Sequence, residues 1–385
     1  MKTLRLHGKS VLCGEGSLSA LKDVSFHRAI LFTGGSSMKK TGVLDRCRSY
    51  LEGPGREMML YSGIGQNPTT AEVEAALKTT REFHPDLILA VGGGSAIDAA
   101  KAILLFYDHP QLNFGNVLNR PLPQVRTGTH LIAVPSTSGT ASEITHVTVI
   151  TYPEKRQKFA IKTEYLRPDL AILDGQIPMT MPAHIAAETG MDALTHALEC
   201  YVNKSGDTFT DALSREAILG ILRWLPVSCR ENTPEARQKM HELSCMAGMA
   251  FSNAGLGMVH GVSHAFSGMF GLPHGLANAV ILPYSMKYNR RDPFVAERYE
   301  SLSRIVGKDI VEDVENLRGA LGIPSDLQKT GIEPARFYAG FEELCKNAMM
   351  GSTAVNPVTV SPDDMAQFIN WIYLGGEMPE NTQKP

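Results

Sequence analysis

The fold is decided by residues 87–107, which read LILAVGGGSAIDAAKAILLFY. Five apolar residues come first, then a Gly-Gly-Gly-Ser turn, then an apolar stretch long enough for a helix. A strand, a tight turn and a helix in this order form the repeating unit of α/β domains with a parallel sheet. The backbone N–H groups of such a turn bind phosphate, although GGGS alone also fits an ordinary tight turn. Its place between strand and helix favours the phosphate site.

Two further segments repeat this pattern. The run AILFT at 29–33 precedes GGSS, and LIAV at 131–134 precedes PSTSGTAS, whose hydroxyls and amides would lie at a strand end. We expect strand, turn and helix in each case. Residues 1–181 are therefore predicted to form an α/β dinucleotide-binding domain with a largely parallel sheet. After Pro182 the chain becomes rich in Ala, Met and Leu at helical spacing, which predicts an all-α domain over 182–385.

Composition limits the class of protein. The chain has 385 residues, of which 43% are hydrophobic and 20% charged, and a length above one ordinary core predicts two domains. The net charge of -3 comes without long blocks of one sign, so neither nucleic acid nor an anionic membrane is an expected partner. Six scattered cysteines lack C-x-x-C spacing, and the start of the chain lacks an apolar leader. Both features favour the cytoplasm.

Residues 243–286 contain no Asp, Glu, Lys or Arg, which predicts a buried segment. Gly, Ser, Asn, His and Pro interrupt it too often for a membrane span. Within it, His260 and His264 stand four residues apart, so one helix face would carry both, while Gly271 and Pro273 break the chain before His274. A buried imidazole must form a hydrogen bond or bind something. Satisfied core histidines are the alternative to a metal site.

A second set of polar residues lies on the predicted helix 183–201. Glu188, Asp192 and His196 recur every four residues on an otherwise apolar helix, with Glu199 beside them. Such a stripe faces either water or a metal. Together with the three histidines downstream, Asp192 and His196 would supply a carboxylate and an imidazole. One carboxylate and imidazoles suit iron(II) or zinc, and a bound ion of this kind is a Lewis acid.

At this point the sequence resembles a known family. The segments GGGSAIDAAK, PSTSGTASE, GMDALTHALE and GMVHGVSHAFSGMFGLPHGLANAVILPYSMKYN, in this order, are similar to the iron-dependent (group III) alcohol dehydrogenases. The resemblance spans nearly the whole chain. It implies an alcohol dehydrogenase or aldehyde reductase that passes hydride between NAD(P)H and a small alcohol or aldehyde. Residues 1–181 would then bind the dinucleotide, and residues 182–385 would form the metal-binding and catalytic domain, with catalysis in a cleft between the two. The metal would be Fe(2+), or alternatively Zn(2+).

The resemblance also implies roles for individual residues. The metal ligands would be Asp192, His196, His260 and His274, and the catalytic histidine near the nicotinamide would be His264. Phe251 would lie beside the substrate. The pyrophosphate would contact Gly93, Gly94 and Ser95, the nicotinamide side would be lined by Thr137 and Ser138, and Asn67 and Lys158 would face the cofactor.

The choice between the two nicotinamide cofactors can be argued from charge. NAD sites place an acidic residue after a strand to accept from the ribose 2′-OH, whereas NADP sites need small or basic residues there. Gly34 stands where relatives that prefer NAD carry Asp. We therefore expect a preference for NADP(H) over NAD(H), with Gly35, Ser36 and Lys39 near the 2′-phosphate. Alternatively, GGSS is only a turn and both cofactors work.

His264 is the candidate for relaying a proton to solvent, because imidazole exchanges protons near neutral pH. We expect a homodimer or a higher homo-oligomer. Two other functions remain open from the sequence: a lyase similar to dehydroquinate synthase, and a non-catalytic protein that binds metal or nucleotide. The identity of the alcohol or aldehyde, and iron as against zinc, do not follow from the residues.

Overall fold

The chain was analysed as a computed structural model that describes residues 3–155 and 157–377. Its residues group into two compact units. The first comprises Met1–Met181 and Asn232–Cys245, and the second comprises Pro182–Glu231 and Met246–Pro385. The short segment 232–245, the beginning of a long helix, thus belongs to the first unit although it follows residue 182.

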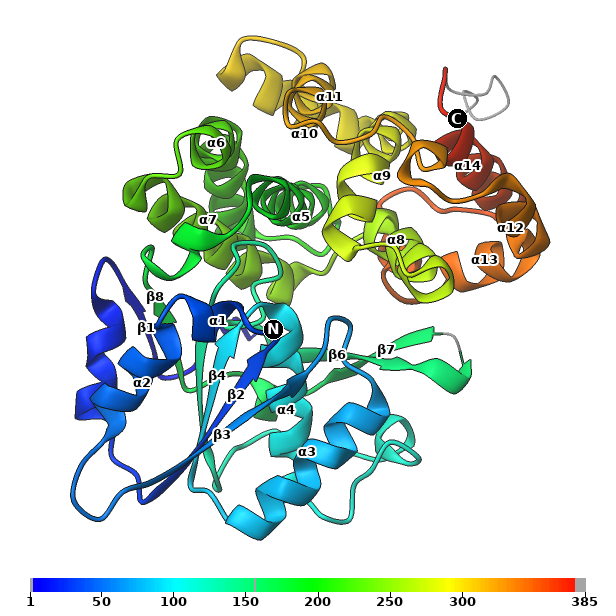
Figure 1. Cartoon of the computed structure of the whole chain (residues 1–385). Coiled ribbons are helices and arrows are strands. Elements are labelled where there is room, and N and C mark those ends of the chain that lie inside the picture. Colours follow the sequence, from blue (N-terminus) through cyan, green and yellow to red (C-terminus); the bar gives the residue numbers. More distant parts are fainter. Residues whose placement is uncertain (1–2, 156, 378–385) are drawn as a thin grey trace. The chain divides into compact units, whose positions relative to one another are not determined.

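A six-stranded parallel sheet forms the centre of the first unit (Figure 1). Its order is β1-β8-β5-β4-β2-β3, and every neighbouring pair is parallel. The predicted strands at 29–33, 87–91 and 131–134 are all present. The strands are β1 (Ser10–Cys13), β2 (Arg28–Gly34), β3 (Glu57–Ile64), β4 (Leu87–Gly92), β5 (His130–Pro135) and β8 (Leu170–Leu173).

Both faces of this sheet are buried, because alternate side chains point to opposite layers. Ile30, Ile88 and Leu131 pack on the side of α3 (Thr70–Phe83) and α4 (Gly94–Asp108). The intervening residues, among them Leu31, Leu89 and Ile132, pack on the side of α2 (Val43–Leu51) and a short 3-10 turn (Ser17–Asp23). The near-continuous apolar runs of the central strands follow from this double burial.

The strand order reverses between β2 and β4. From β2 the chain proceeds to β3 on one side, and from β4 it proceeds to β5 on the other. Ligands of open α/β sheets bind at the carboxyl ends of strands at such a point. These two strands end at Gly34 and Gly92, which are followed by α1 (Ser37–Lys40) and α4.

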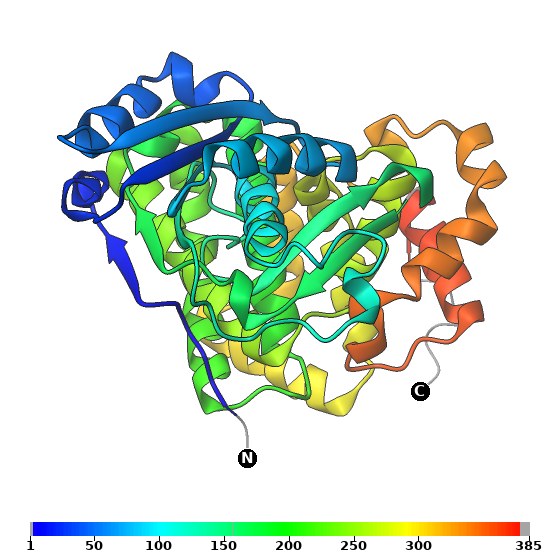
Figure 2. The same ribbon diagram turned by 90° about the horizontal axis from the view of Figure 1, so that it is seen from below.

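The predicted helix after PSTSGTAS is wrong. Residues 136–146 form a loop that leads into a two-stranded antiparallel hairpin, β6 (Val147–Tyr152) and β7 (Gln157–Lys162), which the sequence analysis did not anticipate (Figure 2). Serine and threonine hydroxyls bond locally and compete with a helix, as Thr140 does with Ser142. The buried Lys101 of α4 then donates to the carbonyls of Thr145 and Val147, which fixes the entry to β6.

The second unit is helical in its described residues, as predicted. α5 packs against α6 and α9, and α8 packs against α9 and α13. The predicted helix 183–201 is α5, and the predicted break before His274 is present because α8 ends at Gly271, whose φ is 74°. The helices are α5 (Ala183–Tyr201), α6 (Thr208–Arg230), α7 (Pro234–Ala254), α8 (Met258–Phe270), α9 (His274–Asn289), α10 (Pro293–Val306), α11 (Ile310–Ala320), α12 (Pro334–Ala339), α13 (Phe341–Ala348) and α14 (Pro362–Leu374).

Among the described residues, no helix is long and apolar enough to cross a bilayer. The uncharged segment 243–286 is accordingly divided among α7, α8 and most of α9, and many of its side chains are fully buried.

The first half of α7 supports the loop that follows β5. Within the first unit, Nδ1 of His241 lies 3.0 Å from Oγ of Ser138, and both side chains are buried. Burial, reinforced by the charge of Arg237, lowers the pKa of His241 from 6.5 to about 4. The imidazole is therefore neutral in the folded protein at neutral pH.

This contact predicts a pH dependence of stability. Between pH 6.5 and 4 the unfolded chain binds a proton at residue 241 that the folded protein does not, so the free energy of unfolding decreases as pH falls. The full loss from this group is on the order of 3 kcal/mol and is complete below pH 4. His241→Gln should show a shallower decrease than wild type in urea unfolding at pH 7, 6, 5 and 4.

His27→Gln, which removes an exposed imidazole of the same unit, controls for the loss of a histidine as such. Parallel curves for wild type and His241→Gln would contradict the assignment.

Candidate metal centre and dinucleotide cradle

Three of the predicted metal ligands meet inside the second unit. Asp192, His260 and His274 each offer one ligand atom, and these atoms lie within 4.8 Å of one another. The Oδ1 atom of Asp192 is 3.7 Å from Nε2 of His260 and 3.8 Å from Nε2 of His274. Asp192 and His260 are only 2% exposed, while the side chain of His274 is 22% exposed. The group is buried but reachable from one side.

Each residue comes from a different helix. Asp192 lies in the middle of α5, His260 in the first turn of α8, and His274 is the first residue of α9. The glycine at 271 and the proline at 273 end one helix and start the next, which returns His274 toward His260. Their ring centroids are 5.4 Å apart.

The fourth predicted ligand, His196, lies next to this group. Its Nδ1 atom is 3.9 Å from Oδ1 of Asp192, one turn away on α5, and its ring stacks on His260 with a centroid distance of 4.4 Å. Phe251 stacks on the other side of His196, also at 4.4 Å. His264 stacks on His274 at 4.8 Å. The four predicted metal ligands, His264 and Phe251 therefore lie close together within the second unit.

In His260 and His274 the Nδ1 atom is hydrogen-bonded, so the Nε2 atom faces the other ligand atoms. Nδ1 of His260 lies 2.6 Å from Oε2 of Glu199, and because a carboxylate only accepts, this nitrogen carries the proton. Ser263 donates to the carbonyl of His260, so it accepts from Nδ1 of His274. With Nδ1 engaged in this way, each ring turns Nε2 toward the other ligand atoms, the orientation in which a histidine binds a metal.

Asn278 supplies an independent check on this assignment. Its Nδ2 atom lies 2.6 Å from Oδ1 of Asp192, 3.2 Å from Nε2 of His260 and 3.1 Å from Nε2 of His274. An amide NH2 group has two hydrogens, so it donates to at most two of these atoms at a time, but all three ligand atoms lie around this one nitrogen. The donor set therefore fits a borderline divalent cation. Sequence reasoning missed Asn278, although its position four residues after His274 on α9 was a usable signal.

Glu199 anchors this arrangement from behind. Its Oε1 atom accepts from the backbone N–H of Val259 at 2.6 Å, while Oε2 holds His260. The carboxylate thus lies at the N-terminus of the 13-residue helix α8, where the helix dipole favours negative charge. A carboxylate that orients a metal-binding imidazole in this way also raises the basicity of the ring.

The predicted cofactor residues gather at the carboxyl ends of the parallel strands of the first unit. A Cβ atom at Gly94 would lie 2.6 Å from Oγ1 of Thr140, so only glycine allows the two chains to approach at the start of α4. A Cβ atom at Gly93 would make only an ordinary contact with the hydroxyl of Thr137, at 3.5 Å. The backbone amide of Asn67 donates to Oγ of Ser95 at 3.3 Å.

The hairpin β6–β7 bonds to these residues at the carboxyl ends of the strands. Nζ of Lys158, on β7, donates to Oδ1 of Asn67 at 2.8 Å. β6 is held in turn by Asp98 of α4, whose carboxylate accepts from the backbone of Val149. Ser95, Asn67 and Lys158 are therefore connected by hydrogen bonds. Gly35, Ser36 and Lys39 are exposed at the end of β2 and the start of α1.

The role of Glu199 gives a prediction for metal affinity. In Glu199→Gln the amide can present a donor to Nδ1 of His260, which favours the tautomer whose Nε2 carries a proton and cannot bind a metal. We expect the affinity for Zn(2+) or Fe(2+) to fall roughly 10- to 100-fold, measured by competition with a chromophoric chelator. Glu188→Gln, earlier on α5, is the matched control. Equal affinities of Glu199→Gln and wild type would contradict this role.

Comparisons with known proteins agree with this geometry. Residues 8–175 match the family described as iron-containing alcohol dehydrogenase, and residues 186–373 match the C-terminal domain of the Fe-containing alcohol dehydrogenase family. The chain is similar to an NADPH-dependent butanol dehydrogenase of Clostridium saccharobutylicum, at 37% identity over 96% of this chain and 98% of the relative. It is also similar to a 1-propanol dehydrogenase of Citrobacter freundii, at 38% identity over 79% and 78% of the two chains.

A solved structure of an iron-containing alcohol dehydrogenase from Thermococcus thioreducens superimposes with a TM-score of 0.90 at 36% identity, covering 97% of this chain and 100% of that chain. These matches exclude the lyase and the non-catalytic alternatives. The chain belongs to the iron-containing alcohol dehydrogenase family and is an NAD(P)-dependent oxidoreductase that acts on alcohols and aldehydes.

Proposed function

We propose that this enzyme reduces short aliphatic aldehydes of about three or four carbons with NADPH, at a metal held by Asp192, His196, His260 and His274. The convergence of three ligand atoms within 4.8 Å carries this proposal. The names of the butanol and propanol dehydrogenases support the chain length of the substrate. Phe251, stacked on His196, would provide an apolar wall beside the substrate carbon chain.

The bound divalent ion would supply a Lewis acid that polarises the carbonyl group. The residues of the chain do the remaining work. Asp192 contributes the negative charge of the set and Glu199 fixes the tautomer of His260. A bound nicotinamide would supply the hydride, so the protein itself would need no nucleophile.

His264 is proposed to deliver the proton that completes the alcohol. It is half-buried on the same face of α8 as His260, with ring centroids 6.2 Å apart, and stacks on His274. An imidazole in that position can exchange protons with solvent and with a group held at the centre.

The preference for NADPH rests on the end of β2. Gly34 places no carboxylate at this strand end, and the exposed Lys39, on the short helix α1 that follows, adds a positive charge. Both features suit a 2′-phosphate. The NADPH dependence of the relative from Clostridium saccharobutylicum supports the same choice. Gly35, Ser36 and Lys39 would surround the phosphate, while Gly93, Gly94 and Ser95 would bind the pyrophosphate, and Asn67, Thr137, Ser138 and Lys158 would line the remainder of the cofactor.

A homodimer or higher homo-oligomer also forms part of the proposal. The sheet order places β3 at an edge of the sheet, and Leu60 on this strand is 43% exposed. An edge strand with an exposed apolar side chain is a surface on which a second copy can pair.

The cofactor proposal predicts the outcome of a charge substitution. In Gly34→Asp a carboxylate would repel the 2′-phosphate of NADPH and could accept from the 2′-OH of NADH. We expect kcat/KM with butyraldehyde to favour NADPH in wild type and the ratio of NADPH to NADH to fall at least tenfold in the variant, a change of about 1.4 kcal/mol. The new Cβ would lie 3.2 Å from the carbonyl of Ile64, so a small loss of stability should accompany it. A clear NADH preference of the wild type would refute the proposal.

The proposed roles of the histidines predict two classes of variant. Asp192→Ala and His260→Ala should lose bound metal and activity together, because each removes a ligand. His264→Ala should keep the metal and lose roughly 10²- to 10⁴-fold in kcat, the range expected when a proton-transfer group is removed. Elemental analysis and steady-state kinetics of the same preparations check both. Loss of metal from His264→Ala, or full activity of metal-free wild type, would contradict the assignment.

A further inference from the structure

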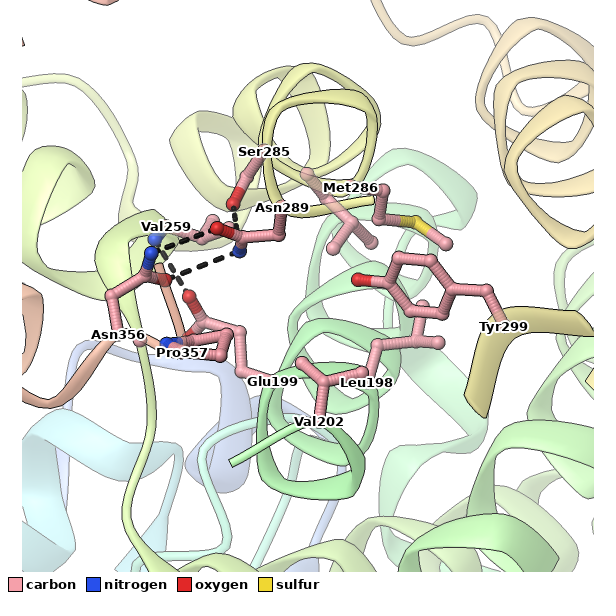
Figure 3. A pocket seen from close by; sticks show the side chains of 12 residues that line it. Leu198, Glu199, Val202, Val259, Ser285, Met286, Asn289, Tyr299, Asn356 and Pro357 are labelled. Atoms are coloured by element: carbon pink, nitrogen blue, oxygen red, sulfur yellow. Dashed lines mark hydrogen bonds between the residues drawn. The ribbon is translucent and has the colours of Figure 1, made fainter. Parts of the chain in front are cut away.

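A small cavity lined by Glu199, a neighbour of the proposed ligand His260, lies within the second unit (Figure 3). Its volume is about 10 Å³, and Figure 3 shows Glu199, Asn289 and Asn356 grouped on one side, with apolar side chains and Tyr299 on the other. Asn356 follows the 3-10 turn Gly351–Val355, nearly one hundred residues after His260 in the chain. The resemblance assigned no role to either asparagine.

The amide of Asn356 uses its whole hydrogen-bonding capacity. Its Oδ1 atom accepts from the backbone N–H of Met258 at 3.1 Å and from Nδ2 of Asn289 at 3.1 Å. Its Nδ2 atom donates to Oδ1 of Asn289 at 2.8 Å and to the carbonyl of Val358 at 2.9 Å. An amide offers two donors and two acceptor positions, so all four are occupied. The paired amides form a rigid connection between α9 and the segment that follows residue 355.

Asn356 and Glu199 together cap the first turn of α8. The backbone N–H of Met258 donates to Asn356, and that of the next residue, Val259, donates to Glu199. Helix N-termini leave such N–H groups without partners in the helix itself, and here side chains from two other segments satisfy them. The capping residue, Gly257, makes no side-chain cap of its own.

The fit around this turn is tight. A Cβ atom at Gly257 would lie 2.9 Å from Oε1 of Glu199 and 3.0 Å from Oδ1 of Asn356. The chain therefore passes between the two capping groups with no room for a side chain. A displacement of Asn356 would free the turn to move, and the N–H of Val259 and Nδ1 of His260 would then no longer meet the two oxygens of Glu199 at 2.6 Å each.

We propose that Asn356, locked by Asn289, is a positioning residue for the metal centre: it fixes the first turn of α8 so that Glu199 can hold His260 in its metal-binding orientation. The proposal rests on the proposed role of His260 as a ligand. Asn356 does not touch the ligand atoms, so its effect must appear in metal affinity and must pass through Glu199 and His260.

The test compares Asn356→Ala, Asn289→Ala and wild type after removal of metal by chelation. The affinity for Zn(2+) is measured by competition with a chromophoric chelator, and the midpoint of thermal unfolding is measured on the same samples. We expect both variants to bind Zn(2+) roughly 3- to 10-fold more weakly. Mutation of a residue that hydrogen-bonds directly to a metal ligand lowers metal affinity about 10- to 100-fold, and the two asparagines act one step further away. At saturating metal, kcat should stay within about twofold of wild type, because the ligands themselves are unchanged.

Val314→Ala controls for destabilisation as such, because Val314 is fully buried on α11 and does not line this cavity. It should lower the unfolding midpoint without weakening Zn(2+) binding. Equal weakening by this control, or unchanged affinity in both asparagine variants, would overturn the proposal. If Asn356→Ala does not fold, the Zn(2+) affinity of Asn289→Ala alone decides the question. This variant removes the partner of Asn356 but keeps the side chain of Asn356 that caps Met258.

A double-variant cycle tests the route of the effect. In the background of Glu199→Gln, Asn356→Ala should weaken Zn(2+) binding less than it does in wild type, because both act through His260. Full additivity would overturn that route. If the wild type binds no metal, the proposed metal centre itself is refuted. If the wild type binds metal and the Asn356 variant binds it equally well, only the role of Asn356 is refuted.

Discussion

The contact between Glu199 and the first turn of α8 is the interaction on which the catalytic half of this molecule depends. One carboxylate satisfies a backbone N–H group and an imidazole N–H group at 2.6 Å each. A buried carboxylate is costly unless it is fully hydrogen-bonded, and here the bonds and the helix dipole compensate for its burial. The bond to Nδ1 also decides which nitrogen of His260 carries a proton. The stability of α8 and the chemistry of the site are therefore set by the same atoms.

The first unit presents backbone rather than side chains where the cofactor is proposed to bind. The glycine at residue 94 lets α4 approach Thr140 where a side chain would collide, and the N-terminus of α4 directs its amides toward the ends of the strands. The hairpin β6–β7 carries Lys158 at this edge, and Asp98 and the buried Lys101 of α4 hold the hairpin by its backbone. The charges that fix the scaffold thus lie on α4, whereas the lysine proposed to face the cofactor lies on the strand that they support.

Much of this could be predicted from the sequence, because the relevant signals are local. The central strands, α5, and the helix that carries His260 and His264 follow from periodicity and from glycine and proline at the breaks. The loop after β5 does not form the predicted helix, because its serine and threonine hydroxyls bond to the local backbone in place of helical hydrogen bonds. Asn356, Asn289 and His241 were missed for another reason: each acts on a residue far away in the chain, and a single asparagine or histidine carries no pattern that reveals its partner.

The cap on α8 has a consequence for the maturation of the enzyme. Every proposed ligand lies between residues 192 and 274, whereas the amide that closes the helix turn is residue 356. A nascent chain that has left the ribosome through α9 already carries all its ligands but not the group that secures one of them. The first turn of α8 is consequently completed only when the segment after residue 355 has folded back onto it, later than the synthesis of every proposed ligand.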